Sequence, residues 1–221
     1  VAIHFGGGRH HSHADKAGGF CFISDVILAI KRLLYGNNAQ VDDGMFVVDP
    51  PIAQRNLVFR RVLYLDIDVH HGDAVQAEFY YTDQVLTTSF HRYSAGFYPT
   101  TGAISEKGET GTKGLGYSLN IPLPARTVDV DFVQIYRKAL FGLCKAYDPH
   151  AIVLLVGTDG LEGDELVSGS FENAVSGEGW DLSPEGLSEC VRITAALCAG
   201  QSEDEICVAP VNKQQAGKTH N

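Results

Sequence analysis

The sequence predicts an α/β domain in which a mainly parallel sheet is covered by helices on both faces. Apolar segments that run almost without polar interruption are typical of strands buried on both sides. Segments with helical periodicity alternate with them, and this alternation favours parallel strands joined by helices. The 221 residues, of which 44% are hydrophobic, are enough for one sizeable core, so one domain is expected.

The elements follow in chain order. A first helix is expected after Ser24 or Asp25, either of which can cap its start, and Gly36 ends it. Ser183 followed by Pro184 is typical of the start of a last helix, whose periodicity stops at Ala199. The expected strands are 61–69, 84–91, 117–123 and 151–157, and a strongly amphipathic helix is expected at 130–147.

We expect residues 1–198 to form a single domain with insertions at 36–59 and 167–182, followed by a polar tail at 199–221. The first insertion carries glycine, asparagine and a proline pair, although a short strand at 45–48 fits inside it. The apolar opening residues have no preceding linker. The chain is therefore expected to begin within the domain.

The composition excludes some partners and favours an intracellular setting. A formal net charge of −10 argues against a nucleic-acid surface, which would be basic, and is compatible with a basic partner. No apolar run approaches the length of a membrane span, and the opening residues lack a signal-peptide pattern. The five cysteines are widely spaced without a Cys-x-x-Cys pair, which indicates reduced thiols. We expect no direct contact with nucleic acid or membrane.

Acidic and imidazole side chains gather where two expected strands end. In "YLDIDVHHGD", Asp66, Asp68 and His70 alternate, so an extended strand would project them together. A further ligand should come from another strand end, where Asp159 and Asp164 follow an apolar run. Carboxylates that close a buried strand need neutralising, and oxygen and imidazole ligands suit a divalent metal such as a catalytic zinc. Ordinary turn aspartates are the alternative.

A second cluster, "GGGRHHSHADKAGGF", sets His10 and His11 after glycines that let the backbone approach a ligand. Neutral imidazole can take a proton from a metal-bound water and return it to a leaving group. Asp66 and Asp73 are not needed as metal ligands and could orient these rings through the far nitrogen. A surface loop is the alternative, and His13 is expected to be a surface residue of that kind.

Aromatic side chains near the site allow two interpretations. Tyr98 lies in "SFHRYSAGFYPTTG", and Phe20 lies in "GGFCF". Aromatic residues in loops usually pack, but these could instead line a narrow apolar tunnel for an aliphatic chain. Both alternatives remain open from the residues.

These stretches, in this order, resemble the zinc-dependent histone deacetylase family, and its class I members most. The matching segments are "GGGRHHSHADKAGGFCFISDVILAI", residues 61–102, "KGLGYSLNIPL" and residues 152–164. The resemblance implies an arginase/deacetylase-like fold and a partial catalytic domain that is incomplete at both ends. It also implies a hydrolase that removes the acetyl group from acetyl-lysine in histones or other proteins, with Zn²⁺ and a structural K⁺. The implied role is chromatin regulation and transcription repression, within a corepressor complex. The implied location is the nucleus, and the cytoplasm as well.

The same resemblance implies roles for residues of this chain. The implied zinc ligands are Asp68, His70 and Asp159. The implied proton-transfer pair is His10 and His11, of which His11 is the general base. Those that would hold the pair are Asp66 and Asp73, and those that would line the acyl-lysine tunnel are Phe20 and Tyr98. The residues around the implied potassium are Asp66, Asp68, His70, Ser89 and Phe90.

The chain departs from the family pattern in several places. The family's glycine-rich turn, whose tyrosine donates to the developing oxyanion, should follow the last helix, where this sequence has "SEDEICVAPVNKQQ". The family's opening strand and acidic rim loop are also expected to be missing. Arg9 stands in place of an apolar residue near the inner exit pocket, Tyr98 in place of Phe, and Thr100 in place of Gly.

Two rival functions remain. The first is a small-molecule amide or guanidine hydrolase of the same fold, although a binuclear manganese version would need another carboxylate near Asp73 and "HHGD" fits one metal. The second is a catalytically silent interaction module that keeps the metal site but lacks the oxyanion tyrosine.

Overall fold

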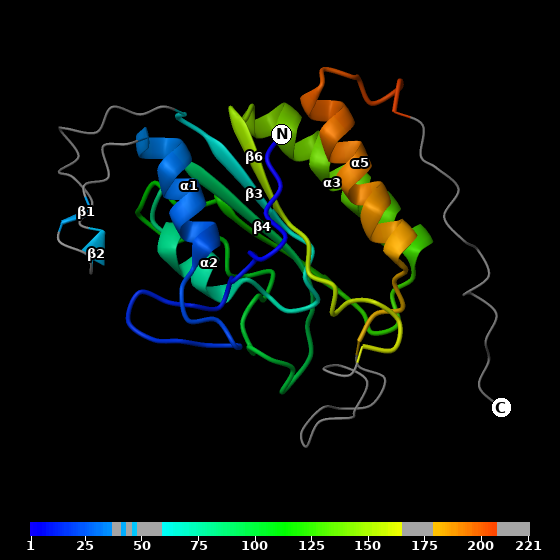
Figure 1. The fold of residues 1–221 in the computed structure, drawn as a ribbon, viewed down its shortest axis with the longest axis horizontal. Helices are drawn as coiled ribbons and strands as arrows, with labels where there is room; N and C mark the ends of the chain where they lie inside the picture. The colour runs from blue at the N-terminus through cyan, green and yellow to red at the C-terminus, as the bar shows by residue number, and fades with distance from the viewer. Residues whose placement is uncertain (37–40, 43–45, 48–58, 165–178, 207–221) are drawn as a thin grey trace.

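A parallel sheet forms the centre of the chain (Figure 1). The computed structural model describes residues 1–36, 41–42, 46–47, 59–164 and 179–206. Four strands pair in the order β5-β4-β3-β6, each parallel to its neighbours. Their bounds are β3 Val62–Asp66, β4 Val85–Arg92, β5 Ser118–Leu123 and β6 Ala151–Leu155. A separate antiparallel pair consists of β1 (Val41–Asp42) and β2 (Phe46–Val47).

Helices cover both faces of this sheet, which confirms the expected fold class (Figure 1). The helices are α1 Asp25–Tyr35 and α2 Asp73–Phe79 on one face, and α3 Asp129–Tyr147 and α5 Pro184–Cys198 on the other. Alternate side chains of β3 divide between the two layers, as the pleat requires. Tyr64 packs in one cluster with Ile30 of α1, whereas Leu63 packs in the other with Tyr136 of α3.

Side chains at the helix ends explain where the helices begin and how they pair. The hydroxyl of Ser24 accepts a hydrogen bond from the Ile27 amide at 3.3 Å and so caps α1. The Ser183 amide, at the start of α5, donates to the carboxylate of Asp129, at the start of α3, at 2.8 Å. The two helices therefore start side by side, and both bury apolar side chains in the same core cluster.

The strand expected at 61–69 ends earlier, at Asp66. Its continuation is replaced by two local turns in which carboxylates accept backbone amides: Asp68 N–H donates to Asp66 Oδ1 at 3.1 Å, and His70 N–H donates to Asp68 Oδ1 at 2.8 Å. Aspartate side chains compete for the backbone in this way wherever they can close a turn. The expectation that one extended strand projects all three side chains is therefore wrong.

Helix α2 was not expected from the sequence. It has 7 residues, fewer than two turns, so its pattern cannot be separated from a turn by periodicity. Its inward-facing side chains are Ala74, Val75, Gln76 and Phe79, all buried. The helix places Asp73 at its first position, close to the turns that follow β3.

Several segments bear on the expected domain boundaries, which remain a prediction. Most of the insertion at 36–59, most of that at 167–182 and residues 207–221 of the tail lie outside the described residues. The strand expected at 45–48 appears as β2. Trp180 and Leu182, at the end of the second expected insertion, are buried in the core. Among the described helices, none is long and apolar enough to cross a membrane.

A buried polar network lies under the turns that follow β3. The ring of His71 is bonded at Nδ1 to Thr101 Oγ1 (2.8 Å) and at Nε2 to Gln76 Oε1 (3.1 Å). The same Gln76 oxygen accepts from Ser118 Oγ at 2.9 Å and from Asn120 Nδ2 at 2.8 Å. A neutral His71 ring with its proton on Nε2 satisfies both of its partners.

Glu106 joins this network to the loop between β4 and β5. One of its oxygens accepts from the amides of Gly102 and Ala103, both at 3.0 Å, and the other accepts from Gln76 Nε2 at 2.7 Å. The loop is thereby tied to α2 and, through Gln76, to the turn that carries His71. Burial and the nearby His91 lower the pKa of His71 to about 4.

Replacing His71 with Gln should make the protein less sensitive to acid. The unfolded ring binds a proton near its model value of 6.5, whereas the folded ring stays neutral down to about 4. The stability that depends on the neutral ring is therefore present above the unfolded pKa and is lost as the pH falls, by about 2 kcal/mol between pH 7 and pH 5. Denaturant unfolding of the metal-free protein at both pH values measures this loss.

His91, whose pKa is also lowered, should keep part of the pH dependence in the His71→Gln variant. The control is His4→Gln, at a ring whose side chain is 74% exposed. If the acid-induced loss of stability were equal in the wild type and in His71→Gln, the neutral His71 ring would not be its cause.

Candidate metal centre

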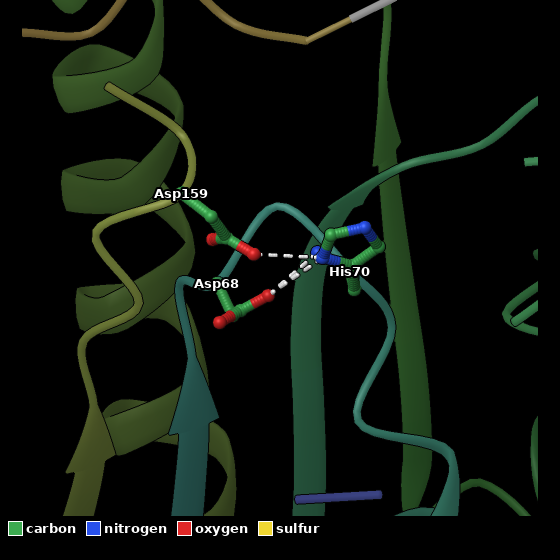
Figure 2. Close-up of side chains that lie close together, drawn as sticks. All are labelled: Asp68, His70 and Asp159. Atoms are coloured by element: carbon green, nitrogen blue, oxygen red, sulfur yellow. Dashed lines mark hydrogen bonds and ion pairs between the residues drawn. The ribbon is translucent and has the colours of Figure 1, made fainter. Parts of the chain in front are cut away.

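Two neighbouring strand ends bring Asp68, His70 and Asp159 together (Figure 2). β3 and β6 are paired in parallel, so the residues that follow them meet at one edge of the sheet. Nδ1 of His70 lies 2.7 Å from Asp159 Oδ2 and 3.4 Å from Asp68 Oδ1. One ligating atom from each of the three side chains lies within 4.8 Å of the others. Of the two candidate acids after the second strand, the cluster contains Asp159 rather than Asp164.

The donor set fits a divalent cation. Burial, together with the like charge of Asp68, raises the pKa of Asp159, because two carboxylates face each other in a poorly solvated place. Bound charge of opposite sign would relieve that repulsion. The ligands are also held in place, since Val69 N–H donates to Asp159 Oδ1 at 3.2 Å and His70 N–H donates to Asp68. A set of three protein ligands from carboxylate and imidazole side chains is typical of a catalytic metal site.

His10 is held between two acids. Its Nδ1 donates to Asp66 Oδ2 at 2.8 Å, and that oxygen also accepts from the Tyr64 hydroxyl at 2.6 Å. Its Nε2 lies 3.7 Å from Asp68 Oδ1. Burial by itself would lower the pKa of His10, but the charges of Asp66 and Asp68 outweigh burial and raise it to about 10. A cation in the metal centre would oppose this rise.

His11 has the arrangement of an oriented base. Its Nδ1 donates to Asp73 Oδ1 at 2.7 Å, which leaves Nε2 with a free lone pair. The ring centroid of His11 lies 4.0 Å from that of His10 and 6.2 Å from that of His70. A Cβ added at Gly19 would lie 2.3 Å from a carbon of the His11 ring, so only glycine fits beside it.

The segment that carries both histidines is fixed by α1 and α2. Both oxygens of Asp25 accept amides from it, from Gly8 at 2.9 Å and from Arg9 at 2.8 Å. The Ala74 amide donates to the His10 carbonyl at 3.2 Å. The Arg9 side chain is exposed and donates to the Gly6 carbonyl at 2.8 Å, so it bonds within its own turn.

The two aromatic residues expected near the site, Tyr98 and Phe20, differ in how close they lie to it. Tyr98 lies edge-on to His11, with ring centroids 5.0 Å apart and an interplanar angle of 80°. Phe97 stacks on His70 at 5.2 Å and 13°, a contact not expected from the sequence. Phe20 is 82% exposed on the turn after Gly19, with φ +63°. Tyr98 and Phe97 therefore flank the metal centre, and the tunnel remains a prediction.

The expected potassium neighbours lie on the adjacent strand. Ser89 of β4 pairs in register with Asp66 of β3, and its hydroxyl is 3.0 Å from His91 Nδ1. The Phe90 side chain is fully buried in the core, packed near Tyr136. The potassium site remains a prediction.

Three contributing residues were missed or misjudged from the sequence. Tyr64 reads as an ordinary core aromatic, but it donates to Asp66. Asp25 reads as a helix cap, but it anchors the histidine segment. His13 was expected at the surface, yet its Nε2 donates to Asp73 Oδ2 at 3.0 Å, and its side chain is 22% exposed.

Comparison with known proteins identifies relatives of this chain. A family profile described as "Histone deacetylase domain" matches residues 1–209. Histone deacetylase B of Dictyostelium discoideum is 38% identical over 197 residues, which is 89% of this chain and 38% of the relative. Histone deacetylase 6 of Arabidopsis thaliana is 38% identical over 192 residues, which is 87% of this chain and 33% of the relative.

Histone deacetylase 8 of Xenopus laevis is 33% identical over 192 residues, 87% of this chain and 48% of the relative. The chain thus spans between about a third and a half of the length of these curated relatives.

Removing one ligand should abolish stoichiometric metal binding. Asp68→Ala and Asp159→Ala each delete a carboxylate of the cluster, while Asp164→Ala deletes the neighbouring acid that lies outside it. Zinc serves as the probe ion, and atomic absorption after dialysis measures the ion retained per chain. Asp164→Ala should keep the wild-type content. If Asp159→Ala retained full zinc while Asp164→Ala lost it, the ligand assignment would be wrong.

Proposed function

The chain belongs to the histone deacetylase family, and on this premise we propose that it hydrolyses the acetyl amide of acetyl-lysine in histones or other proteins, with zinc held by Asp68, His70 and Asp159. Family membership supports deacetylation in general, and the zinc dependence and the acetyl-lysine substrate are the proposed refinements. The observation that carries the proposal is the position of His11, an oriented imidazole beside a three-ligand metal cluster.

The chemistry divides between the metal and the histidine pair. Zinc in the cluster would supply Lewis acidity toward the amide carbonyl and toward water. His11 takes the proton from the attacking water on Nε2, because Nδ1 is occupied by the bond to Asp73. The same nitrogen then returns the proton to the departing lysine amine. Asp73 keeps the ring in this tautomer throughout.

His10 is the second member of the pair. Asp66 holds its Nδ1, so the ring stays packed against His11 and close to Asp68. We assign it the stabilisation of negative charge as the amide is attacked. Ser89 and Phe90, beside Asp66, Asp68 and His70, are proposed to surround a structural potassium.

The substrate class follows from the walls of the site. Acetylated lysine is uncharged, so it costs less to desolvate beside aromatic rings than a free ammonium would. Tyr98 and Phe97 flank the metal centre, and we propose that Phe20 closes over the bound stem. The formal net charge of −10 favours basic protein partners such as histone tails. A nuclear setting, together with the cytoplasm, and a corepressor complex belong to the same proposal.

Two alternatives make different predictions. A small-molecule amidohydrolase of the same fold would prefer a short acetylated amine over a peptide, and a binuclear version would bind two metal ions. A silent interaction module would bind zinc without turnover, an alternative favoured by the absence of tyrosine from residues 202–215. Acetate release by the full-length, zinc-loaded protein from an acetyl-lysine peptide and from a short acetylated amine separates all three functions. No release from the peptide would refute the proposal.

In that protein, His11→Ala should reduce turnover of the acetyl-lysine peptide by about 100-fold or more, the usual loss when a general base is removed. Zinc content should not change, because His11 is not a ligand of the cluster. The control is His4→Ala, at the exposed ring near the start of the chain. A His11→Ala rate equal to that of the control would assign proton transfer to another residue.

A further inference from the structure

We infer that His13 is a positioning residue for proton transfer, because through Asp73 it fixes His11 in the orientation that leaves Nε2 free to act. The inference deepens the proposed function and rests on it for its catalytic consequence. Its structural part concerns only the contacts among His11, Asp73 and His13.

The two oxygens of Asp73 are divided between two imidazoles. Oδ1 accepts from His11 Nδ1 at 2.7 Å, and Oδ2 accepts from His13 Nε2 at 3.0 Å. A carboxylate turns easily about its last side-chain bond, since that torsion has broad, two-fold minima. With one partner, Asp73 could turn and lengthen the bond to His11. The second bond blocks this motion.

Asp73 and His13 are anchored on different segments. Asp73 begins α2, and its amide donates to the His71 carbonyl at 2.8 Å. The amide of His13 donates to the Lys16 carbonyl at 3.0 Å, which closes the turn that carries it. His13 therefore reaches Asp73 from a backbone that is itself fixed. Its contact holds the carboxylate oxygen that His11 does not bond.

The side chains become more exposed along this chain of contacts. His11 is 5% exposed, Asp73 is 16% and His13 is 22%. Burial alone would raise the pKa of Asp73, but the bonds from His11 and His13 lower it, so the carboxylate stays an ionised acceptor for both. His13 thus closes the solvent side of the carboxylate, where water would otherwise compete for Oδ2.

The chemistry of His13 suggests a matched pair of variants. Only a donor at the position of Nε2 can hold Oδ2, and the amide nitrogen of Gln reaches about as far as Nε2 of His. His13→Gln keeps a donor without a titratable ring, and His13→Ala removes the donor. Asp15→Ala, at an exposed residue of the same turn, is the control for a change of the loop itself.

The first experiment measures kcat and KM of the full-length, zinc-loaded protein on an acetyl-lysine peptide. His13→Ala should lower kcat by about 10-fold to 100-fold, the usual effect of removing a group that orients an active residue, with KM within about twofold of the wild type. His13→Gln should recover kcat to within about threefold, and Asp15→Ala should match the wild type. If His13→Ala had wild-type kcat, or if His13→Gln failed as badly as His13→Ala, the inference would be overturned.

The second experiment needs no activity. In protein labelled with ¹⁵N-histidine, the Nδ1 proton of His11 should be observed and slowly exchanging in the wild type and in His13→Gln. In His13→Ala it should exchange faster by about tenfold or more, because Asp73 has lost its second partner. An unchanged exchange rate would overturn the inference. If the wild-type protein did not cleave the peptide, the proposed function would fail, and this measurement alone would decide whether His13 holds Asp73.

Discussion

The structure depends on how it accommodates negative charge at the carboxyl ends of two buried strands. Asp66 is fully buried and Asp68 nearly so, which would be strongly unfavourable for unpaired carboxylates. Each carboxylate has donors nearby: Tyr64, His10 and the Asp68 amide for Asp66, and the amide and ring of His70 for Asp68. Asp159 accepts from Val69 N–H and from the His70 ring, yet burial and the like charge of Asp68 still raise its pKa. A cation held between these carboxylates would offset the remaining repulsion.

The parallel sheet makes this arrangement possible. Because β3 and β6 run in the same direction and pair directly, ligands 89 residues apart in the chain meet without a long loop. The helices contribute the rest: α1 anchors the histidine segment through Asp25, and α2 supplies Asp73. The layers that bury the core thus also set the positions of the side chains in the candidate site.

Much of this could be predicted from the sequence, and the remainder could not for identifiable reasons. Long apolar runs give the strands because burial on both faces excludes polar side chains. The turn after Asp66 was missed because the same residues fit an extended strand until the carboxylates are seen to accept amides. Asp159 and Asp164 both follow the strand and the residues alone leave both open; the family resemblance implied Asp159, and the fold places it beside His70. His13 was misjudged because its partner lies 60 positions away, on a helix too short to recognise.

The network centred on Gln76 ties the loop that begins at Gly102 to the turn that follows β3. Its amide joins His71, β5 and, through Glu106, the loop that begins at Gly102. This loop is therefore not an independent element that can change without effect on its neighbours. A substitution that reshapes it also disturbs the hydrogen bonds of His71, the residue next to His70. Sequence change near the candidate site is then less costly outside the network, and the exposed turn that carries Phe20 lies outside it.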